Sequence, residues 1–194
     1  MTEDSLPDEF PVRDTFPHDS SELVDWLTTL VRNREYGTLA NLRRTGTRTN
    51  AHIRAGWFGG SEHRDLFERM AILFALYHQG RSCPSYGYGS LGAAAARIGD
   101  GTGRGPDNPG AQRLVERVVA SRRVPWRHLQ HTVVRLRSCD QAPPSWSRLT
   151  EDLIRWNDRR ARIAYNWSVD FHTPAGKART LIGKTQNDQK DRTA

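Results

Sequence analysis

The sequence predicts an all-α protein built as a helical bundle, and two observations carry this prediction. Apolar residues recur at steps of three and four along most of the chain between residues 19 and 171, which is the period of an amphipathic helix. No segment shows the sustained alternation of apolar and polar residues that a half-buried strand requires. We expect about five to eight helices, arranged as one bundle or as two packed subdomains joined by a Gly-rich loop.

The composition divides the chain into five segments. An acidic stretch with three prolines and no apolar period comes first and is expected to be disordered, and a polar tail ends the chain. Two helical parts lie between them, separated by a Gly/Pro-rich loop whose residues are poorly suited to packing. The expected boundaries, in chain order, are residues 1–18, 19–98, 99–110, 111–171 and 172–194.

Capping signals begin the first helices of the N-terminal part. Asp19 and Glu22 have the spacing of a capping box and precede the apolar positions of residues 23–31, which predicts a helix that ends near residue 36. A short helix with two inward-facing leucines is expected at 38–44.

The clearest core helix follows at residues 61–79, where apolar positions widen until they nearly surround the helix. We expect Ser61 to cap this helix and Gly80 to end it. After a loop rich in glycine, serine and tyrosine, Ser90 is expected to cap a short helix that ends at Ile98.

The C-terminal part begins after the Gly-rich stretch 99–110, which lacks the Lys-Ser/Thr ending of a phosphate-binding loop and is interpreted as a flexible connector. Helical periodicity resumes at 114–119, and Pro125 suits the first turn of another helix. A last long helix is expected at 145–171. At 100° per residue its aromatic-rich apolar seam is flanked by a ridge of four arginines.

Composition excludes several classes of protein. No apolar run approaches the roughly 20 residues that a membrane-spanning helix needs, and the acidic N-terminus lacks the pattern of a signal peptide. The chain has two cysteines, Cys83 and Cys139, too few for a disulfide framework or a zinc site. We therefore expect a cytoplasmic protein.

The net charge of +7 conceals two parts of opposite sign. The first 25 residues carry eight acids and one arginine, a net of −7, so the other 169 residues carry +14. Of the 29 basic residues, 26 are arginines, whose planar guanidinium matches phosphate. The predicted partner is a polyanion, although a genome rich in G and C would favour arginine whatever the function.

Arginines gather in three clusters, which we predict to bind nucleic-acid backbone. The alternative is a solvated surface in an arginine-biased chain. The predicted binding residues are Arg43, Arg44, Arg48 and Arg54 in the first cluster, Arg122, Arg123 and Arg127 in the second, and Arg148, Arg155, Arg159 and Arg162 in the third.

Candidates for stacking and catalysis are few. The aromatic residues that suit base stacking, or equally the anchoring of Gly-rich loops, are Trp57, Phe58, Tyr86 and Tyr88. His128 and His131 lie three residues apart without the paired Glu/His motif of a metal site. We expect no catalytic residue, no metal and no cofactor, and thus no enzyme.

Several motifs, taken in order, resemble the CasB family, the small subunit of the type I-E CRISPR Cascade complex. The resemblance spans about residues 20–171, and the acidic N-terminus lies outside it. It rests on Gly37-Thr-Leu-Ala-Asn-Leu-Arg-Arg44, Leu73-Phe-Ala-Leu-Tyr-His78, Ser90-Leu-Gly-Ala-Ala, Trp146-Ser-Arg-Leu149, Asp152-Leu153, Trp156 and Trp167.

The resemblance implies a non-enzymatic all-α subunit of a ribonucleoprotein that acts in antiviral defence. Its partners would be other Cas subunits, a guide RNA, target DNA with its displaced single strand, and a second copy of itself. Its basic surface would hold nucleic acid during R-loop formation, with Arg43 and Arg44 matching the family's Leu-Arg-Arg motif. Two alternatives remain open, a purely protein-binding scaffold subunit and a helical nuclease or metal-dependent enzyme.

Overall fold

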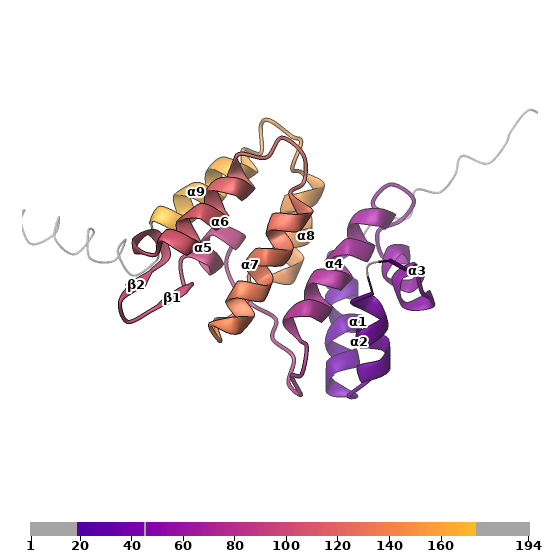
Figure 1. The fold of residues 1–194 in the computed structure, drawn as a ribbon. Coiled ribbons are helices and arrows are strands. Elements are labelled where there is room, and N and C mark those ends of the chain that lie inside the picture. Colours follow the sequence, from indigo (N-terminus) through magenta and orange to yellow (C-terminus); the bar gives the residue numbers. More distant parts are fainter. Residues whose placement is uncertain (1–18, 45, 174–194) are drawn as a thin grey trace, which may run out of the picture.

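The computed structural model describes residues 19–44 and 46–173, in which α-helices make up most of the regular structure (Figure 1). The all-α prediction is confirmed. The segments expected at 1–18 and beyond residue 173 lie outside the described residues. Within those residues the α-helices are α1 (Ser20–Arg32), α2 (Tyr36–Leu42), α3 (Asn50–Trp57), α4 (Arg64–Tyr77), α5 (Leu91–Ala95), α6 (Pro109–Val119), α7 (Trp126–Ser138), α8 (Trp146–Ile154) and α9 (Ile163–His172).

Figure 1 shows helices α1 to α4 at one end of the molecule and α5, α6 and α9 at the other, with α7 and α8 between them. Helix α7 packs against α4 on one side and against α5 and α6 on the other, while α8 packs against α1 and α4. Helix α5 packs against α9, far away in the sequence. Buried apolar side chains from both ends form one core. No helix in the described part of the chain is both long and apolar enough to cross a membrane.

The structure confirms the capping residue predicted for α1 but not the one predicted for α4. The Asp19 carboxylate accepts hydrogen bonds from the backbone N–H groups of Ser21 and Glu22, at 2.8 and 2.9 Å, and so satisfies two donors that the helix leaves free. The prediction that Ser61 caps α4 is wrong, because the helix begins at Arg64 with His63 at the cap position.

A helix that the sequence analysis did not predict lies between α2 and α4. Helix α3 begins after Thr49, whose side chain accepts from the backbone of His52 while the imidazole of His52 accepts from the backbone of Thr49. This is a capping box with histidine in the place of Glu or Gln. The other ring nitrogen of the buried His52 lies 3.2 Å from the carbonyl of Leu42, which fixes the connection between α2 and α3.

The stretch 99–110, interpreted from its composition as a flexible connector, contains short regular elements. Gly105 is buried with a φ of +55°, and a Cβ at this position would lie 2.6 Å from the carbonyl oxygen of Ala96. The glycine therefore lets the backbone pack where a side chain could not. This stretch contains β1 (Gly99–Asp100), β2 (Gly103–Arg104), which pairs with β1 in antiparallel fashion, and the 3-10 helix η1 (Gly105–Asp107).

The prediction of one helix at 145–171 is wrong, because α8 ends at Ile154 and α9 begins at Ile163. The Asp158 carboxylate accepts from the backbone N–H of Arg160 at 2.9 Å, an Asx turn that competes with helical hydrogen bonding. Arg162 has a left-handed backbone, with φ +48°, and so cannot continue a right-handed helix.

This turn lets α9 pack back against the rest of the molecule. The rings of Trp156 and Trp167 lie 5.1 Å apart between centroids, and the indole N–H of Trp167 donates to the Asp152 carboxylate at 2.7 Å. Burial raises the pKa of Asp152, against the opposing effect of that hydrogen bond. The aromatic residues predicted to line one face of a single helix thus connect two segments, namely α9 and α8 with the turn that follows it.

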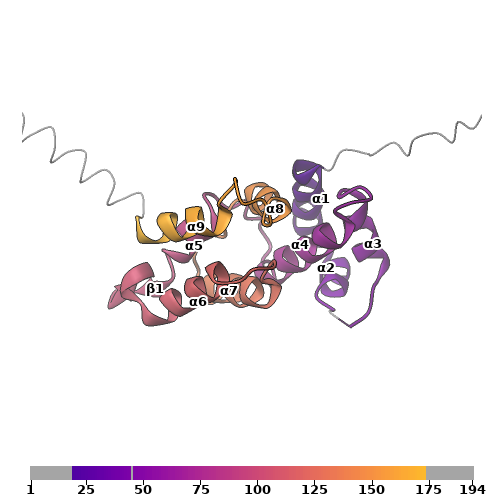
Figure 2. The same cartoon turned by 90° about the horizontal axis from the view of Figure 1, so that it is seen from above.

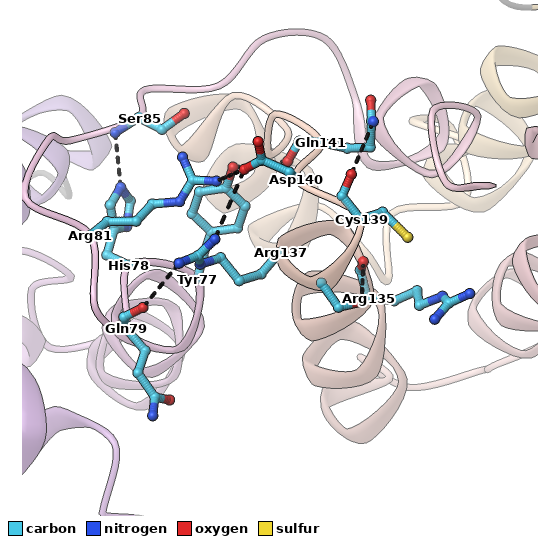
Figure 3. Close-up of polar contacts among 11 residues, drawn as sticks. Tyr77, His78, Gln79, Arg81, Ser85, Arg135, Arg137, Cys139, Asp140 and Gln141 are labelled. Carbon is cyan, nitrogen blue, oxygen red and sulfur yellow. Dashed lines mark hydrogen bonds and ion pairs between the residues drawn. The ribbon is translucent and has the colours of Figure 1, made fainter. Parts of the chain in front are cut away.

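Polar contacts tie the end of α4 to the end of α7 (Figure 3). The guanidinium groups of Arg81 and Arg137 both reach Oδ1 of Asp140, at 2.6 and 3.9 Å. The hydroxyl of Tyr77 donates to the carbonyl of Gln141 at 2.8 Å. The charges of Arg81 and Arg137 are therefore partly neutralised within the chain, so these two arginines contribute less to a basic surface that could bind a ligand.

His78, beside this cluster, is buried as a neutral imidazole. Its Nδ1 lies 2.9 Å from the Phe74 carbonyl. Nε2 accepts from the backbone N–H of Ser85 at 2.9 Å, a contact that Figure 3 shows. Burial lowers the pKa of His78 to about 4, and the charges of Arg81 and Arg137 act in the same direction. Because one nitrogen faces an acceptor and the other a donor, only the neutral ring satisfies both contacts.

Candidate nucleic-acid interface

A groove of about 420 Å³ lies between residues 44 and 46–48, α4 and the start of α7. We call it the α4–α7 groove. Its walls combine cationic, aromatic and amide side chains, and a buried carboxylate lies among them. The residues that matter for its chemistry are Arg44, Arg48, Glu68, Arg69, Trp126 and Gln130.

Each wall of the groove is positioned by an element of the fold. Arg69 projects from the exposed side of α4, and its guanidinium lies 5.3 Å from the centre of the Trp126 ring, close enough for a cation–π interaction. Trp126 and Gln130 stand one turn apart on α7, so both face the same side of that helix. Arg44 follows α2, at the end that His52 fixes through Leu42.

Arg48 joins the connection between α2 and α3 to α4. Its Nε donates to Oε1 of Glu68 at 3.1 Å, and one terminal nitrogen contacts the same oxygen. Asp65 lies 3.9 Å from the guanidinium. The hydrogen bond to Glu68 and its charge raise the pKa of Arg48. Because Glu68 is only 9% exposed, this pair neutralises a carboxylate that would otherwise be buried with its charge unpaired.

The structure divides the first predicted cluster between two places. Arg44 and Arg48 line the α4–α7 groove, and Arg43 is half-buried beside it in the sequence. Arg54 lies on α3 with its guanidinium 5.3 Å from the centre of the Trp26 ring. It lines a separate groove of about 470 Å³ between α1, α2 and α3.

The second cluster lies around the start of α7. Arg122, Arg123 and Arg127 are exposed, and none of them forms an ion pair with another described residue. Arg127 directly follows Trp126, a wall of the groove. The structure therefore brings part of the first cluster close to Arg127, the last member of the second, although about 80 residues separate them in the sequence.

The third cluster is not a ridge on one helix. Arg148 lies on α8 and pairs with Asp170 at 3.7 Å, and Arg155, which directly follows α8, pairs with Asp158 at 3.7 Å. Arg159 is exposed in the turn, and the guanidinium of Arg162 lies 4.2 Å from the centre of the Tyr165 ring. These four arginines lie on α8 and its connection to α9.

Arg160 is exposed in the same turn. In Figure 1 the α8–α9 and α6–α7 connections lie at the same end of the molecule. In Figure 2, seen from above, α8 and α9 lie along one side and α6 and α7 along the other. The second and third arginine clusters, which belong to the α6–α7 and α8–α9 parts of the chain, therefore lie on opposite sides of the molecule in that view.

The aromatic residues predicted for base stacking differ in their exposure and in the contacts that they make within the chain. Trp57 is 68% exposed at the end of α3, not in a Gly-rich loop as predicted. Tyr88 lies under the guanidinium of Arg97, 4.1 Å from the ring centre, and the Tyr86 hydroxyl accepts from Arg32. The two tyrosines thus anchor the loop that precedes α5.

No group of three or more His, Cys, Asp or Glu side chains that could hold a metal ion occurs among the described residues. His128 and His131 lie side by side on α7, 6.5 Å apart between ring centres. The histidines offer no convergent set of ligands there.

Four of the six residues named for the groove were absent from the sequence-based site, namely Glu68, Arg69, Trp126 and Gln130. Arg69 is a single arginine on the exposed side of α4, and Trp126 begins α7. Nothing in the sequence signals their proximity, since it depends on how α4 packs against α7. The spacing of Trp126 and Gln130, one turn apart, was the only local hint.

The fold and this site define a helical protein with an arginine-lined groove. A sequence profile of CRISPR-associated protein Cse2 matches residues 38–172, and the chain belongs to this family. The resemblance to the small subunit of the type I-E Cascade complex is thereby confirmed.

A solved structure agrees on the fold. The chain is similar to CasB from Thermobifida fusca with a TM-score of 0.61 and 20% sequence identity. The match covers 79% of this chain and 95% of that one. At this identity the likeness shows the fold. No curated protein sequence matches the chain.

Proposed function

We propose that this protein is a non-catalytic small subunit of Cascade whose arginine surfaces hold nucleic-acid backbone. It would contact the guide–target region and the displaced DNA strand, and so stabilise the R-loop in antiviral defence. It would act in the cytoplasm with other Cas subunits and with a second copy of itself. Sequence specificity would belong to the guide RNA, because phosphate contacts carry no base information.

The α4–α7 groove carries this proposal. Arg44 and Arg69 reach it from separate elements, and neither forms an ion pair with another described residue. Their charges are therefore available to phosphate, whereas those of Arg48, Arg148 and Arg155 are partly satisfied within the chain. R-loop formation is nearly balanced in free energy, so a few backbone contacts can decide its stability.

The test compares two double variants of the full-length chain with the same loss of charge. Arg44→Ala/Arg69→Ala removes the free cations of the groove. Arg113→Ala/Arg117→Ala removes two exposed arginines from α6, at the other end of the fold. Affinity for a fluorescent single-stranded DNA is measured across a salt series.

We expect the groove variant to lower the slope of log affinity against log salt concentration by about 1 to 1.5, since each single-strand phosphate contact contributes roughly 0.7. The α6 variant should keep the slope of the unmodified chain. Equal losses in the two variants would show diffuse attraction instead of a site. Binding of the unmodified chain that does not depend on salt would favour the protein-scaffold alternative.

A further inference from the structure

We propose that the α4–α7 groove binds a ribose-containing strand in preference to DNA, with Glu68 accepting a hydrogen bond from a 2′-hydroxyl group. This inference rests on the proposed function, because it names the strand that the groove takes. Three features support it: the unused oxygen of Glu68, the free arginines beside it, and the shape and polarity of the walls.

The Glu68 carboxylate is the first feature. Both contacts that Arg48 makes with it go to Oε1. No other residue in the described ranges donates a hydrogen bond to Oε2. The side chain lines the groove and is 12% exposed, so Oε2 is an acceptor that a ligand in the groove can reach.

A carboxylate is unusual in a site that binds phosphates, because it repels the nucleic-acid backbone that the arginines attract. Arg48 offsets its charge but leaves one oxygen without a donor. A ligand that fits here must therefore present both an anion for Arg44 and Arg69 and a donor for Glu68. The phosphate and 2′-hydroxyl of a ribonucleotide provide this combination, and the 2′-hydroxyl is the group that distinguishes RNA from DNA.

The walls of the groove suit the rest of a nucleotide. The Trp126 ring offers an apolar surface, and its cation–π contact with Arg69 holds that guanidinium in place beside it. The Gln130 amide offers both a hydrogen-bond donor and an acceptor. The volume of about 420 Å³ falls within the range of small-molecule sites, roughly 300 to 1,000 Å³. A deoxyribose in the same position would cover Oε2 without giving it a partner.

The experiment uses the full-length chain and fluorescent oligomers of about twelve nucleotides that differ only at the sugar, at about 50 mM salt. Oligo-rU carries the 2′-hydroxyl and oligo-dU lacks it. Oligo-2′-fluoro-U keeps an RNA-like sugar pucker but cannot donate. Uracil has no exocyclic amine, so the base offers Glu68 no competing amino group. Affinities are measured by fluorescence anisotropy.

We expect oligo-rU to bind about tenfold more tightly than oligo-dU, a ratio equivalent to about 1.4 kcal/mol and in the range of one hydrogen bond to a charged group. Oligo-2′-fluoro-U should bind like oligo-dU. Glu68→Met removes the acceptor, and the free charge of Arg48 should then strengthen binding of both strands while the ratio falls toward one. The matched control Glu116→Met, at an exposed position of α6, should keep the tenfold ratio.

Equal affinities for rU and dU would overturn this inference and leave the proposed function standing. The inference would also fail if the fluoro strand bound as tightly as rU, or if a folded Glu68→Met protein kept the preference. Should Glu68→Met not fold, the three strands decide the question on the unmodified chain. Absence of salt-dependent binding to every strand would refute the proposed function together with the inference.

Discussion

His78 makes the stability of this protein depend on pH in a window that the structure sets. The imidazole is buried, with its nitrogens committed to the Phe74 carbonyl and the Ser85 N–H. Its pKa falls from an ordinary 6.5 to about 4 on folding. Above pH 6.5 both folded and unfolded chains hold the neutral ring. As the pH falls below 6.5, the unfolded chain takes up a proton that the folded chain refuses, so folding becomes less favourable until about pH 4.

The size of the effect follows from that shift. A difference of about 2.5 pKa units corresponds to about 3 kcal/mol of unfolding free energy lost between pH 6.5 and 4. Other groups titrate in the same range, so the measurement is a difference between two proteins. Urea unfolding of the unmodified chain and of His78→Gln is followed at several pH values from 7.5 to 4.

We expect His78→Gln to be less stable at pH 7.5, and the stability gap between the two proteins to shrink by about 3 kcal/mol as the pH approaches 4. A gap that stays constant across this range would refute the reasoning. So would an imidazole that titrates near 6.5 in the folded protein by NMR.

Two further predictions concern local structure. Gly105→Ala should destabilise the chain by about 2 kcal/mol, because the residue has a positive φ and its Cβ would clash with the Ala96 carbonyl. Gly101→Ala, where nothing lies within 4 Å of the added Cβ, is its control, and equal thermal shifts in the two variants would contradict the packing described for η1. Asp19→Ala should cost about 1 kcal/mol through loss of the α1 cap, measured by urea unfolding, and an unchanged midpoint would show that the cap contributes nothing.

The sequence predicts the helices well where local signals and packing agree. Asp19 and Ser90 cap their helices as expected. The single helix at 145–171 was wrong for an instructive reason: Trp156, Ile163 and Trp167 keep helical spacing whether the chain continues or turns back. The polar run 157–162 between them, with its Asx turn at Asp158, was the available signal.

The site was less predictable than the fold because it depends on contacts between distant segments. Clustering in the sequence identified Arg44 and Arg48, which line the groove. It also grouped Arg54 with them, although Arg54 lies over Trp26 in a different groove. Arg69 stood alone in the sequence and became part of the site only through the packing of α4 against α7.

The α4–α7 groove also differs chemically from a plain basic patch. Arg48 and Glu68 form an ion pair within it, so the free positive charge belongs to Arg44 and Arg69. Counting arginines would overstate the charge at this place. Arg44 and Arg69, which have no acidic partner among the described residues, remain to hold a phosphate, and the proposed sugar contact falls on the second oxygen of Glu68.

The lifetime of the R-loop in the assembled Cascade complex tests the central claim most directly. Complexes carrying Arg44→Ala/Arg69→Ala or Arg113→Ala/Arg117→Ala are compared with the unmodified complex, after equal subunit incorporation is confirmed. We predict that only the groove variant shortens the R-loop lifetime, and less strongly as salt concentration rises, because salt weakens the phosphate contacts that the variant lacks. An R-loop of unchanged lifetime in the groove variant, or one shortened equally in both, would contradict the proposal that this groove holds nucleic acid.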